Sequence, residues 1–287
     1  TTMNTGTGAF TSTIRAGTGK TNRTSGDITL SNVTAGSLVA TNSGPTSGSD
    51  IEDNGVLTIA GTSSFTTSAN NATITLNNAN AFAGAVALNT TGSNGNATID
   101  GGTTALIIAQ SSVGGNLTLT SGHASGITDS GTVTVGGNLT ATTDANSGVI
   151  NLGTLAIDGT VALTTNGSGN ATVVNDAGLN FAASTVGGAL NATATTGNMT
   201  DSGALAITGT SSFTTSANNA DITLNNTNAF TGAVALNTTG STGNALVDNG
   251  TTALNVAAST VGGNLTLTSG HASGITDSGT VTVGGNL

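Results

Sequence analysis

The sequence predicts an all-β chain folded as a parallel β-helix, a solenoid of about eleven to twelve coils of roughly 22–31 residues each. Three observations carry this prediction. Residues 61–139 return almost verbatim at 209–287, 148 residues later. A shorter pattern centred on glycine recurs inside that period, and the apolar residues around each glycine alternate with polar ones. Repetition at two levels indicates stacked modules of one kind.

The short pattern is apolar–x–Gly–x–apolar–x–apolar, as in VGGNLTL at 113–119. Six spacings between successive marker glycines make up one 148-residue period. The apolar residues alternate with period two and are mostly Val, Ile and Leu, which is typical of half-buried strands and not of helices. The marker glycines of the repeated region are Gly61, Gly84, Gly115, Gly137, Gly159, Gly188, Gly209, Gly232, Gly263 and Gly285.

A module of this length holds two or three short strands, too few for a propeller blade or a sandwich. In a parallel β-helix each module is one coil, so equivalent inward residues stack on each other. We therefore expect unbroken ladders of apolar residues on both sides of the marker glycines. Where Ser63 and Ser211 occupy apolar positions, Phe65 and Phe213 follow two residues later. We expect each such pair to fill one shared volume.

A second recurring pattern, Asp-x-Gly, predicts a turn. The Asp side chain can accept a hydrogen bond from the backbone two residues on, and Gly permits a positive φ. Length variation falls between this turn and the next marker glycine, so we expect segments such as 101–115 to bulge outward as loops. The predicted turn ladder consists of Asp53, Asp100, Asp129, Asp176, Asp201, Asp248 and Asp277.

The charges are sparse and unevenly placed. All three basic residues lie within the first 23 positions, and all thirteen acidic residues follow them. We expect two parts: an N-terminal segment over 1–25, forming an extra coil or a subunit contact, and a β-helix shaft over 26–287. A shaft without Lys or Arg does not attract nucleic acid or anionic lipid. Because the pattern is interrupted at Leu287, we expect a longer or processed protein.

The sequence predicts no enzyme and no cofactor. His123 and His271 are the only histidines, and they are copies of one loop position, GHASG. No nucleophile elbow accompanies them. Calcium is the alternative that the residues leave open, because the turn ladder places Asp100 before Asp129, and Asp248 before Asp277, one coil apart. Close carboxylates repel, and a hard cation relieves that repulsion. Turn capping is the interpretation we favour.

Two further alternatives concern the surface. Thr-x-Thr stretches at 118–120 and 140–142 suggest an ice-binding array, but their equivalents in other coils differ, so we expect no face to carry an unbroken array. Asn-x-Ser/Thr sequons suggest a glycosylated coat, although a chain so rich in Asn and Thr produces them by composition alone. These sequons include Asn96, Asn116, Asn138, Asn170 and Asn198.

The tandem VGGNLTLTSG…ITDSGTVTVGGNL units resemble the shaft repeats of filamentous haemagglutinin-like exoproteins and related giant β-strand-repeat adhesins of Gram-negative bacteria. The resemblance covers roughly residues 26–287. It implies a right-handed β-helix, secretion by the two-partner or autotransporter route, an extracellular or cell-surface location, and a role as fibre or adhesin stalk. We expect its partners to be further copies stacked end to end or the rest of a longer chain, and a host or neighbouring-cell surface.

Overall fold

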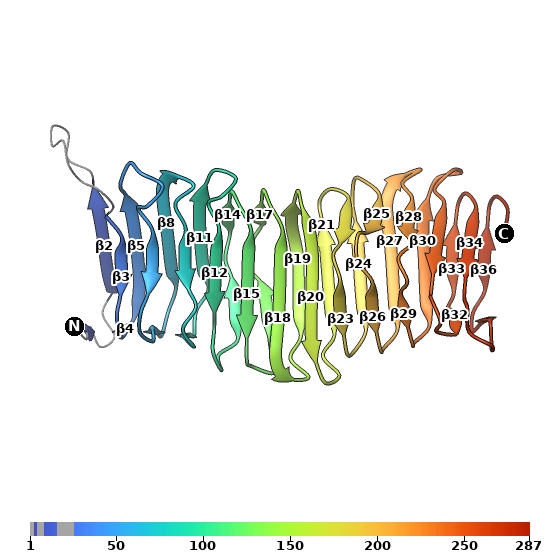
Figure 1. The fold of residues 1–287 in the computed structure, drawn as a ribbon, viewed down its shortest axis with the longest axis horizontal. Coiled ribbons are helices and arrows are strands. Elements are labelled where there is room, and N and C mark those ends of the chain that lie inside the picture. Colours follow the sequence, from blue (N-terminus) through green and yellow to red (C-terminus); the bar gives the residue numbers. More distant parts are fainter. Residues whose placement is uncertain (1–2, 5–8, 16–25) are drawn as a thin grey trace. The chain divides into compact units, whose positions relative to one another are not determined.

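The computed structural model describes residues 3–4, 9–15 and 26–287, and every regular element within them is a β-strand. The chain divides into two compact units, Thr1–Ala145 and Asn146–Leu287. Each unit is a stack of parallel coils (Figure 1), and the two together contain about twelve turns. The predicted all-β parallel solenoid is therefore confirmed, while its right-handedness stays a prediction.

The strands that begin in the first unit are β1 (Met3–Asn4), β2 (Ala9–Arg15), β3 (Ile28–Leu30), β4 (Val33–Ala35), β5 (Ser37–Ser43), β6 (Ile51–Asp53), β7 (Thr58–Ile59), β8 (Ser63–Asn70), β9 (Ile74–Leu76), β10 (Ala81–Phe82), β11 (Val86–Thr91), β12 (Ala97–Asp100), β13 (Leu106–Ile108), β14 (Ser111–Val113), β15 (Leu117–Ser121), β16 (Ile127–Asp129), β17 (Val133–Val135) and β18 (Leu139–Asn146).

The strands of the second unit are β19 (Ile150–Ile157), β20 (Thr160–Asn166), β21 (Ala171–Asn175), β22 (Leu179–Phe181), β23 (Ser184–Val186), β24 (Leu190–Ala194), β25 (Met199–Asp201), β26 (Leu205–Ile207), β27 (Ser211–Asn218), β28 (Ile222–Leu224), β29 (Ala229–Phe230), β30 (Val234–Thr239), β31 (Ala245–Asp248), β32 (Leu254–Val256), β33 (Ser259–Val261), β34 (Leu265–Thr268), β35 (Ile275–Asp277) and β36 (Val281–Val283).

A typical coil consists of one long strand and two short strands, as in β27, β28 and β29. Neighbouring coils pair in parallel at offsets from 19 residues, for Ala171 with Leu190, to 30 residues, for Met3 with Val33. Alternate residues point inward, and the apolar part of the core is mostly aliphatic. This arrangement follows from the period-two pattern, because each strand presents one apolar row to the interior.

Both members of each Ser–Phe pair are buried, as the filling of one shared volume requires. Ser63 and Ser211 are 4 % and 2 % exposed, and Phe65 and Phe213 are fully buried two residues later. Phe213 packs edge-on against Phe230 with ring centroids 5.5 Å apart. The rings therefore pack against each other inside the coils.

The long strands do not stay on one side of the stack. In the first unit, β5, β8 and β11 belong to one sheet, here called the first sheet, whereas β12, β15 and β18 belong to another, the second sheet. A third, four-stranded sheet contains β1, β4, β7 and β10. The longer strand of each coil therefore lies in the first sheet up to β11 and in the second sheet from β12 to β18.

This sheet exchange corrects the expectation of an outward loop at 101–115. Those residues form β13 and β14, which continue the first sheet beyond β11 through the pairs Val86 with Ile108 and Asn89 with Ser112. The strand β15, which follows marker glycine Gly115, pairs with β12 and not with β11. The extra length in the long modules is therefore an additional half-coil of regular strand.

The second unit exchanges sheets twice in the same way. The long strand β20 is continued by the short strands β22 and β23, while β24 stacks on β21. Later, β30 is continued by β32 and β33, while β34 stacks on β31. At each exchange, two long strands follow each other along the chain. They lie in different sheets, and a single turn joins them.

The marker glycines consequently stack in short runs, and the expectation of unbroken ladders is wrong. Gly137 donates its N–H to the Gly115 carbonyl at 3.0 Å, as expected. Gly115 itself donates to Gly95 at 3.0 Å, not to Gly84, the preceding marker. Gly169 and Gly243 receive the same bond from Gly188 and Gly263. The spacings of 29–31 residues between markers are therefore not coil lengths, because an unrecognised marker lies inside each.

Part of the N-terminal segment over 1–25 also pairs with the stack. Strand β1 pairs with β4, and β2 pairs with β5. Residues 16–25, which include Lys20 and Arg23, lie outside the described residues. In the part of the chain that the structure describes, no helix has the length and apolarity needed to cross a membrane.

Candidate functional site: the terminal edge and the polar ladders

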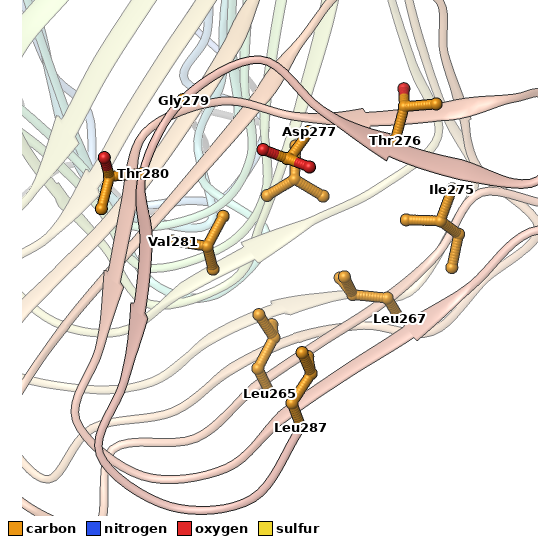
Figure 2. Close-up of a pocket in the computed structure, with 10 residues that line it drawn as sticks. Leu265, Leu267, Ile275, Thr276, Asp277, Gly279, Thr280, Val281 and Leu287 are labelled. Carbon is orange, nitrogen blue, oxygen red and sulfur yellow. The ribbon is translucent and has the colours of Figure 1, made fainter.

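The last coil of the second unit presents an apolar surface, here called the terminal edge, formed by β34, β35, β36 and Leu287. Figure 2 shows Leu265, Leu267, Ile275 and Val281 around one hollow, whose volume is about 340 Å³. Ile275 is 44 % exposed and Leu287 is 84 % exposed. Each of the three strands is paired on one side only, with β31, β32 and β33. At the terminal edge, exposed apolar side chains therefore lie beside strands that are paired on one side within the described chain.

The internal repeat contains a covered version of the same surface. Residues 122–139 are identical in sequence to 270–287. In the first copy Ile127, Val133 and Leu139 are at most 1 % exposed, and β15 pairs with the following long strand β18. One sequence is thus buried in one copy and exposed in the other, so the exposure reflects neighbours and not composition.

A ladder of Asn and Asp side chains runs along the corner before the second-sheet strands. The Asn116 N–H donates to Asn96 Oδ1 at 2.7 Å, and the Asn138 N–H donates to Asn116 Oδ1 at 2.8 Å. The second unit repeats this with Asn198, Asp221, Asn244, Asn264 and Asn286, where each backbone N–H from Asp221 onward donates to Oδ1 of the preceding member. Several predicted sequons are therefore members of a structural ladder, which sequence analysis did not detect.

Four members of the predicted Asp turn ladder fall into two classes. Asp100 and Asp248 accept the N–H of Gly102 and Gly250 at 2.7 and 2.8 Å, as expected for a turn, and both glycines have positive φ. Asp53 instead accepts the Asn77 N–H at 3.0 Å and the Asn80 side chain at 2.7 Å, both in the next coil.

Asp201 repeats the inter-coil bonds of Asp53 with Asn225 and Asn228. The difference follows from the alternation of inward and outward residues along a strand. Asp53 and Asp201 lie two residues after the inward Ile51 and Met199, so they also point inward. Asp100 directly follows the inward Ile99, so it lies on the other face of its strand. Asp129 and Asp277 end β16 and β35, and Asp176 lies exposed after β21.

The carboxylate pairs behind the calcium hypothesis are not stacked. Asp100 pairs with Thr120, and Asp129 pairs with Ile108. Likewise, Asp248 pairs with Thr268 and Asp277 with Val256. Among the described residues there is no group of three or more His, Asp or Glu side chains placed to hold a metal ion. The expectation that these pairs lie next to each other in successive coils is therefore wrong.

One carboxylate has a shifted pKa. Burial raises the pKa of Asp100, and the negative charges of Asp144 and Asp53 raise it further, against the opposing effect of the Gly102 hydrogen bond. The two histidines have a local role instead. His123 Nδ1 accepts the Ser125 N–H at 3.0 Å, and His271 Nδ1 accepts the Ser273 N–H at 3.0 Å. Each imidazole thus caps its own loop.

Outward threonines of the first unit form a column that sequence analysis did not expect. Thr75, Thr98, Thr118 and Thr140 pair in register over four successive coils of the second sheet. Thr120 and Thr142 form a second, shorter column beside it. The expectation that no face carries an unbroken array was based on aligning the marker glycines, and the sheet exchange invalidates that alignment.

Comparison with known proteins places this architecture in a family. The chain matches the family described as repeats of unknown function (DUF5649) in four segments, at 16–89, 94–164, 168–237 and 242–287. The chain belongs to this family. No curated protein and no solved structure matched it.

The DUF5649 repeat is about half of the 148-residue period, and its boundaries coincide with the sheet exchanges. A motif beginning Thr-x-Gly-Ser and ending Gly-Asn-Ala occurs at 90–97, 165–171 and 238–245. The matched segments end at 89, 164 and 237, each directly before the first Thr of this motif. Sequence analysis missed the motif because its Gly-Asn-Ala end resembles a marker glycine with Ala in place of Leu.

Proposed function

We propose that this DUF5649 chain is the shaft of an extracellular bacterial surface fibre or adhesin, and that it acts mechanically, without catalysis and without a cofactor. The observation that supports this most is the continuous inter-coil bonding, in which backbone pairs and side-chain ladders join each described coil to the next within each unit. Such a stack resists extension and bending. Its outer face is rich in Thr, Ser and Asn, and the few charged residues of 26–287 are all acidic.

The resemblance to filamentous haemagglutinin-like shafts supports the extracellular location. Antibodies raised against the chain test it on intact cells of the source organism. We expect surface labelling, lost after brief protease treatment of unpermeabilised cells, with filaments decorated in electron micrographs. A cytosolic protein serves as the negative control. Labelling that requires permeabilisation would contradict the proposal.

We propose that the terminal edge is covered by a further β-coil, from a second copy stacked end to end or from the rest of a longer chain. The supporting observation is the covered copy of the same sequence in the first unit. Amide exchange measured by NMR tests this in the 287-residue chain, because the identical segments around Ile127 and Ile275 have equal intrinsic rates. We expect faster exchange at Ile275 in dilute protein, and protection there as concentration rises. Fast exchange at every concentration in a monodisperse monomer would exclude end-to-end stacking.

Ice binding is a second candidate, and the threonine column of the first unit favours it. A regular array of hydroxyl and methyl groups, repeated at the inter-strand spacing of about 4.8 Å, can order surface water. In the second unit the equivalent column is Thr200, Thr223, Leu246 and Thr266, which Leu246 interrupts. The chain also lacks Trp and Tyr, the rings on which sugars commonly stack.

The difference between the two columns provides a matched test. We expect Thr98→Leu, which copies the second unit, to lower thermal hysteresis, and Leu246→Thr to raise it by completing a four-residue column. Both positions are half-buried and face outward, so neither change disturbs the core. No hysteresis in the native chain or in Leu246→Thr would exclude this function and would leave the shaft proposal intact.

A further inference from the structure

Each sheet exchange contains two buried hydroxyl groups in equivalent places. The pairs are Thr90 with Ser111, Thr165 with Ser184, and Thr238 with Ser259, and all six side chains are at most 8 % exposed. Neither hydroxyl of a pair is explained by the apolar pattern of the coils. Both have hydrogen-bond partners in two successive coils, so they connect the strand before the exchange to the strands after it.

The threonine of each pair bridges the exchange turn. Thr165 Oγ1 donates to the Gly169 carbonyl at 2.8 Å and accepts the Gly187 N–H at 3.0 Å. Thr238 does the same with Gly243 at 2.7 Å and Gly262 at 3.0 Å. In the first unit Thr90 donates to Gly95 and accepts from Gly114 at 3.1 Å. The glycine that donates in the next coil directly precedes a marker glycine in all three cases.

The serine of each pair supplies an acceptor where a long strand faces a corner. At an exchange, two short strands pair with the two ends of one long strand. The corner between the short strands faces the middle of the long strand, which therefore has no backbone partner there. Ser184 Oγ accepts the Leu163 N–H at 3.0 Å and donates to the Ala182 carbonyl at 2.9 Å. Ser111 and Ser259 repeat both bonds, with Leu88 and Leu236 as the donors.

The apolar residues of β24 do not by themselves decide between exchange and continuation. Leu190 and Ala192 of β24 pair with Ala171 and Val173 of β21. If β24 stacked on β20 instead, the same two residues would face Val161 and Leu163, which are equally apolar and fully buried. That register would also place marker Gly188 on marker Gly159, as at other coils. The apolar residues of β24 itself therefore fit either partner, so polar groups at the exchange contribute to the choice between them.

A turn without an exchange provides the comparison. Thr215 is fully buried and donates to the Ala220 carbonyl at 3.0 Å, which resembles the bond from Thr165 to Gly169. Here the long strand β27 is followed in the same sheet by the long strand β30. The contact with the next coil is different, because the Thr239 hydroxyl donates to the Thr215 carbonyl. Donation to the turn is therefore common to both kinds of turn, and acceptance from a glycine N–H accompanies the exchange.

We propose that the Thr–Ser hydroxyl pair is the positioning element that makes a DUF5649 repeat exchange sheets, by satisfying the backbone groups of the exchanged register. In the continuous register the Thr hydroxyl would no longer accept the glycine N–H, and the Ser hydroxyl would no longer accept the leucine N–H. The pair thereby favours the exchanged partner of β24, which the apolar residues of β24 alone do not distinguish from the continuous one. This inference concerns pairing specificity and is independent of the proposed location and role of the protein.

Disulfide trapping in double-cysteine variants tests the pairing directly, because the native sequence contains no cysteine. Thr164 pairs with Thr185 in the exchanged register. In the continuous register, with β24 on β20, Thr164 would face Thr193. Directly paired residues of adjacent strands lie within disulfide range. We expect the 164/185 pair to oxidise readily in the native background and the 164/193 pair not to.

The same two cysteine pairs are then compared in Thr165→Val plus Ser184→Ala. We expect the yield of the disulfide between positions 164 and 185 to decrease by about fivefold, and the disulfide between positions 164 and 193 to appear. A change of this size corresponds to the loss of one or two hydrogen bonds. The single variant Thr165→Ser, which keeps the hydroxyl, should show the native disulfide yields. Thr215→Val is the matched control, since it removes a buried threonine hydroxyl from a turn without an exchange. It should leave both disulfide yields unchanged.

Amide exchange keeps the test decisive if the double variant is poorly folded. The single variants Thr165→Val and Ser184→Ala should accelerate exchange at Gly187 and Leu163 respectively by about fivefold, without equal acceleration elsewhere in the unit. The proposal is overturned if the hydroxyl-free variants keep the native disulfide pattern and native protection at these two amides. It is also overturned if Thr215→Val has the same effects on the disulfides as the double variant.

Discussion

At the scale of single residues, the solenoid is held together by small polar side chains whose value depends on their partners. Ser259 is 4 % exposed and makes two hydrogen bonds at 2.8 and 3.0 Å. Ser211 is 2 % exposed, and its hydroxyl has no hydrogen-bond partner. A buried hydroxyl without a partner costs stability, whereas one that satisfies a backbone group contributes to it.

These two serines therefore predict opposite effects of one substitution. Ser211→Ala should raise the free energy of unfolding by about 1 kcal/mol, because it removes an unsatisfied polar group at little cost in volume. Ser259→Ala should lower it by about 1–3 kcal/mol, because it leaves the Leu236 N–H without its acceptor. Urea unfolding of both variants and the native chain provides the measurement. A loss of stability in Ser211→Ala would contradict this account of the buried hydroxyl.

Asp100 predicts a pH dependence of stability in the acidic range. Because burial raises its pKa in the folded state, the folded chain binds the proton more tightly than the unfolded chain. Stability from this group is therefore present below the unfolded pKa and decreases as pH rises through the folded pKa. Asp100→Asn removes the titration and should flatten this part of the curve of unfolding temperature against pH. An unchanged curve in the variant would show that Asp100 makes no such contribution.

At the scale of strands, the apolar alternation predicted the elements well and the glycine pattern predicted their stacking only in part. Period-two segments such as 113–119 became strands as expected. The segment 101–115 did not become a loop, because Leu106 and Ile108 supply an inward row of their own. The stacking order depends on which backbone groups meet in space, and the short Gly-Asn-Ala signals at Gly95, Gly169 and Gly243 carry that information only weakly.

The close approach of coils at the marker glycines predicts a steric effect. A Cβ at Gly209 would lie 2.5 Å from the carbonyl carbon of Gly188, whereas a Cβ at Gly153 would have no neighbour within 4 Å. Gly209→Ala should therefore lower the free energy of unfolding by about 3 kcal/mol, and Gly153→Ala should be tolerated. Thermal unfolding of the two variants tests this. Equal unfolding temperatures would contradict the close stacking of marker glycines.

Buried amides at strand ends predict a second contrast. Asn249 is fully buried, accepts the Phe230 N–H at 2.7 Å and donates to the Phe230 carbonyl at 3.1 Å, which imitates a backbone pair. Asn249→Ala should cost about 3 kcal/mol, because both backbone groups lose their partner. Asn255→Ala is the control, since Asn255 Oδ1 has no hydrogen-bond partner. The difference in denaturation midpoints between the two variants measures the effect.

At the scale of the whole molecule, the fold class and the absence of helices in the described residues followed from the sequence, because repetition and period-two patterning are global signals. The arrangement of the candidate carboxylate pairs did not follow from the sequence. The sheet exchange displaces the register by half a coil, which separates residues that the alignment of marker glycines had placed next to each other. Asp100 and Asp129 illustrate this, since each pairs with a neutral residue.

Calcium gives a prediction at this scale. Without stacked carboxylates, added calcium should leave the unfolding temperature of the chain unchanged, and a chelator should also leave it unchanged. Differential scanning calorimetry with calcium, with magnesium as the control cation, and with EDTA measures this. A calcium-specific rise in unfolding temperature would restore a metal-stabilised solenoid as the better description.

Each sheet exchange adds half a coil, so an odd and an even number of repeats place the following long strands in different sheets. Within the second unit, the long strands lie in the first sheet from β21 to β30 and return to the second sheet at β31. Gaining or losing one DUF5649 repeat by recombination would therefore transfer every downstream surface feature to the other sheet, whereas gaining or losing two would preserve it. The near-identity at 148 residues, and not at half that distance, is what duplication in even numbers would leave in the sequence.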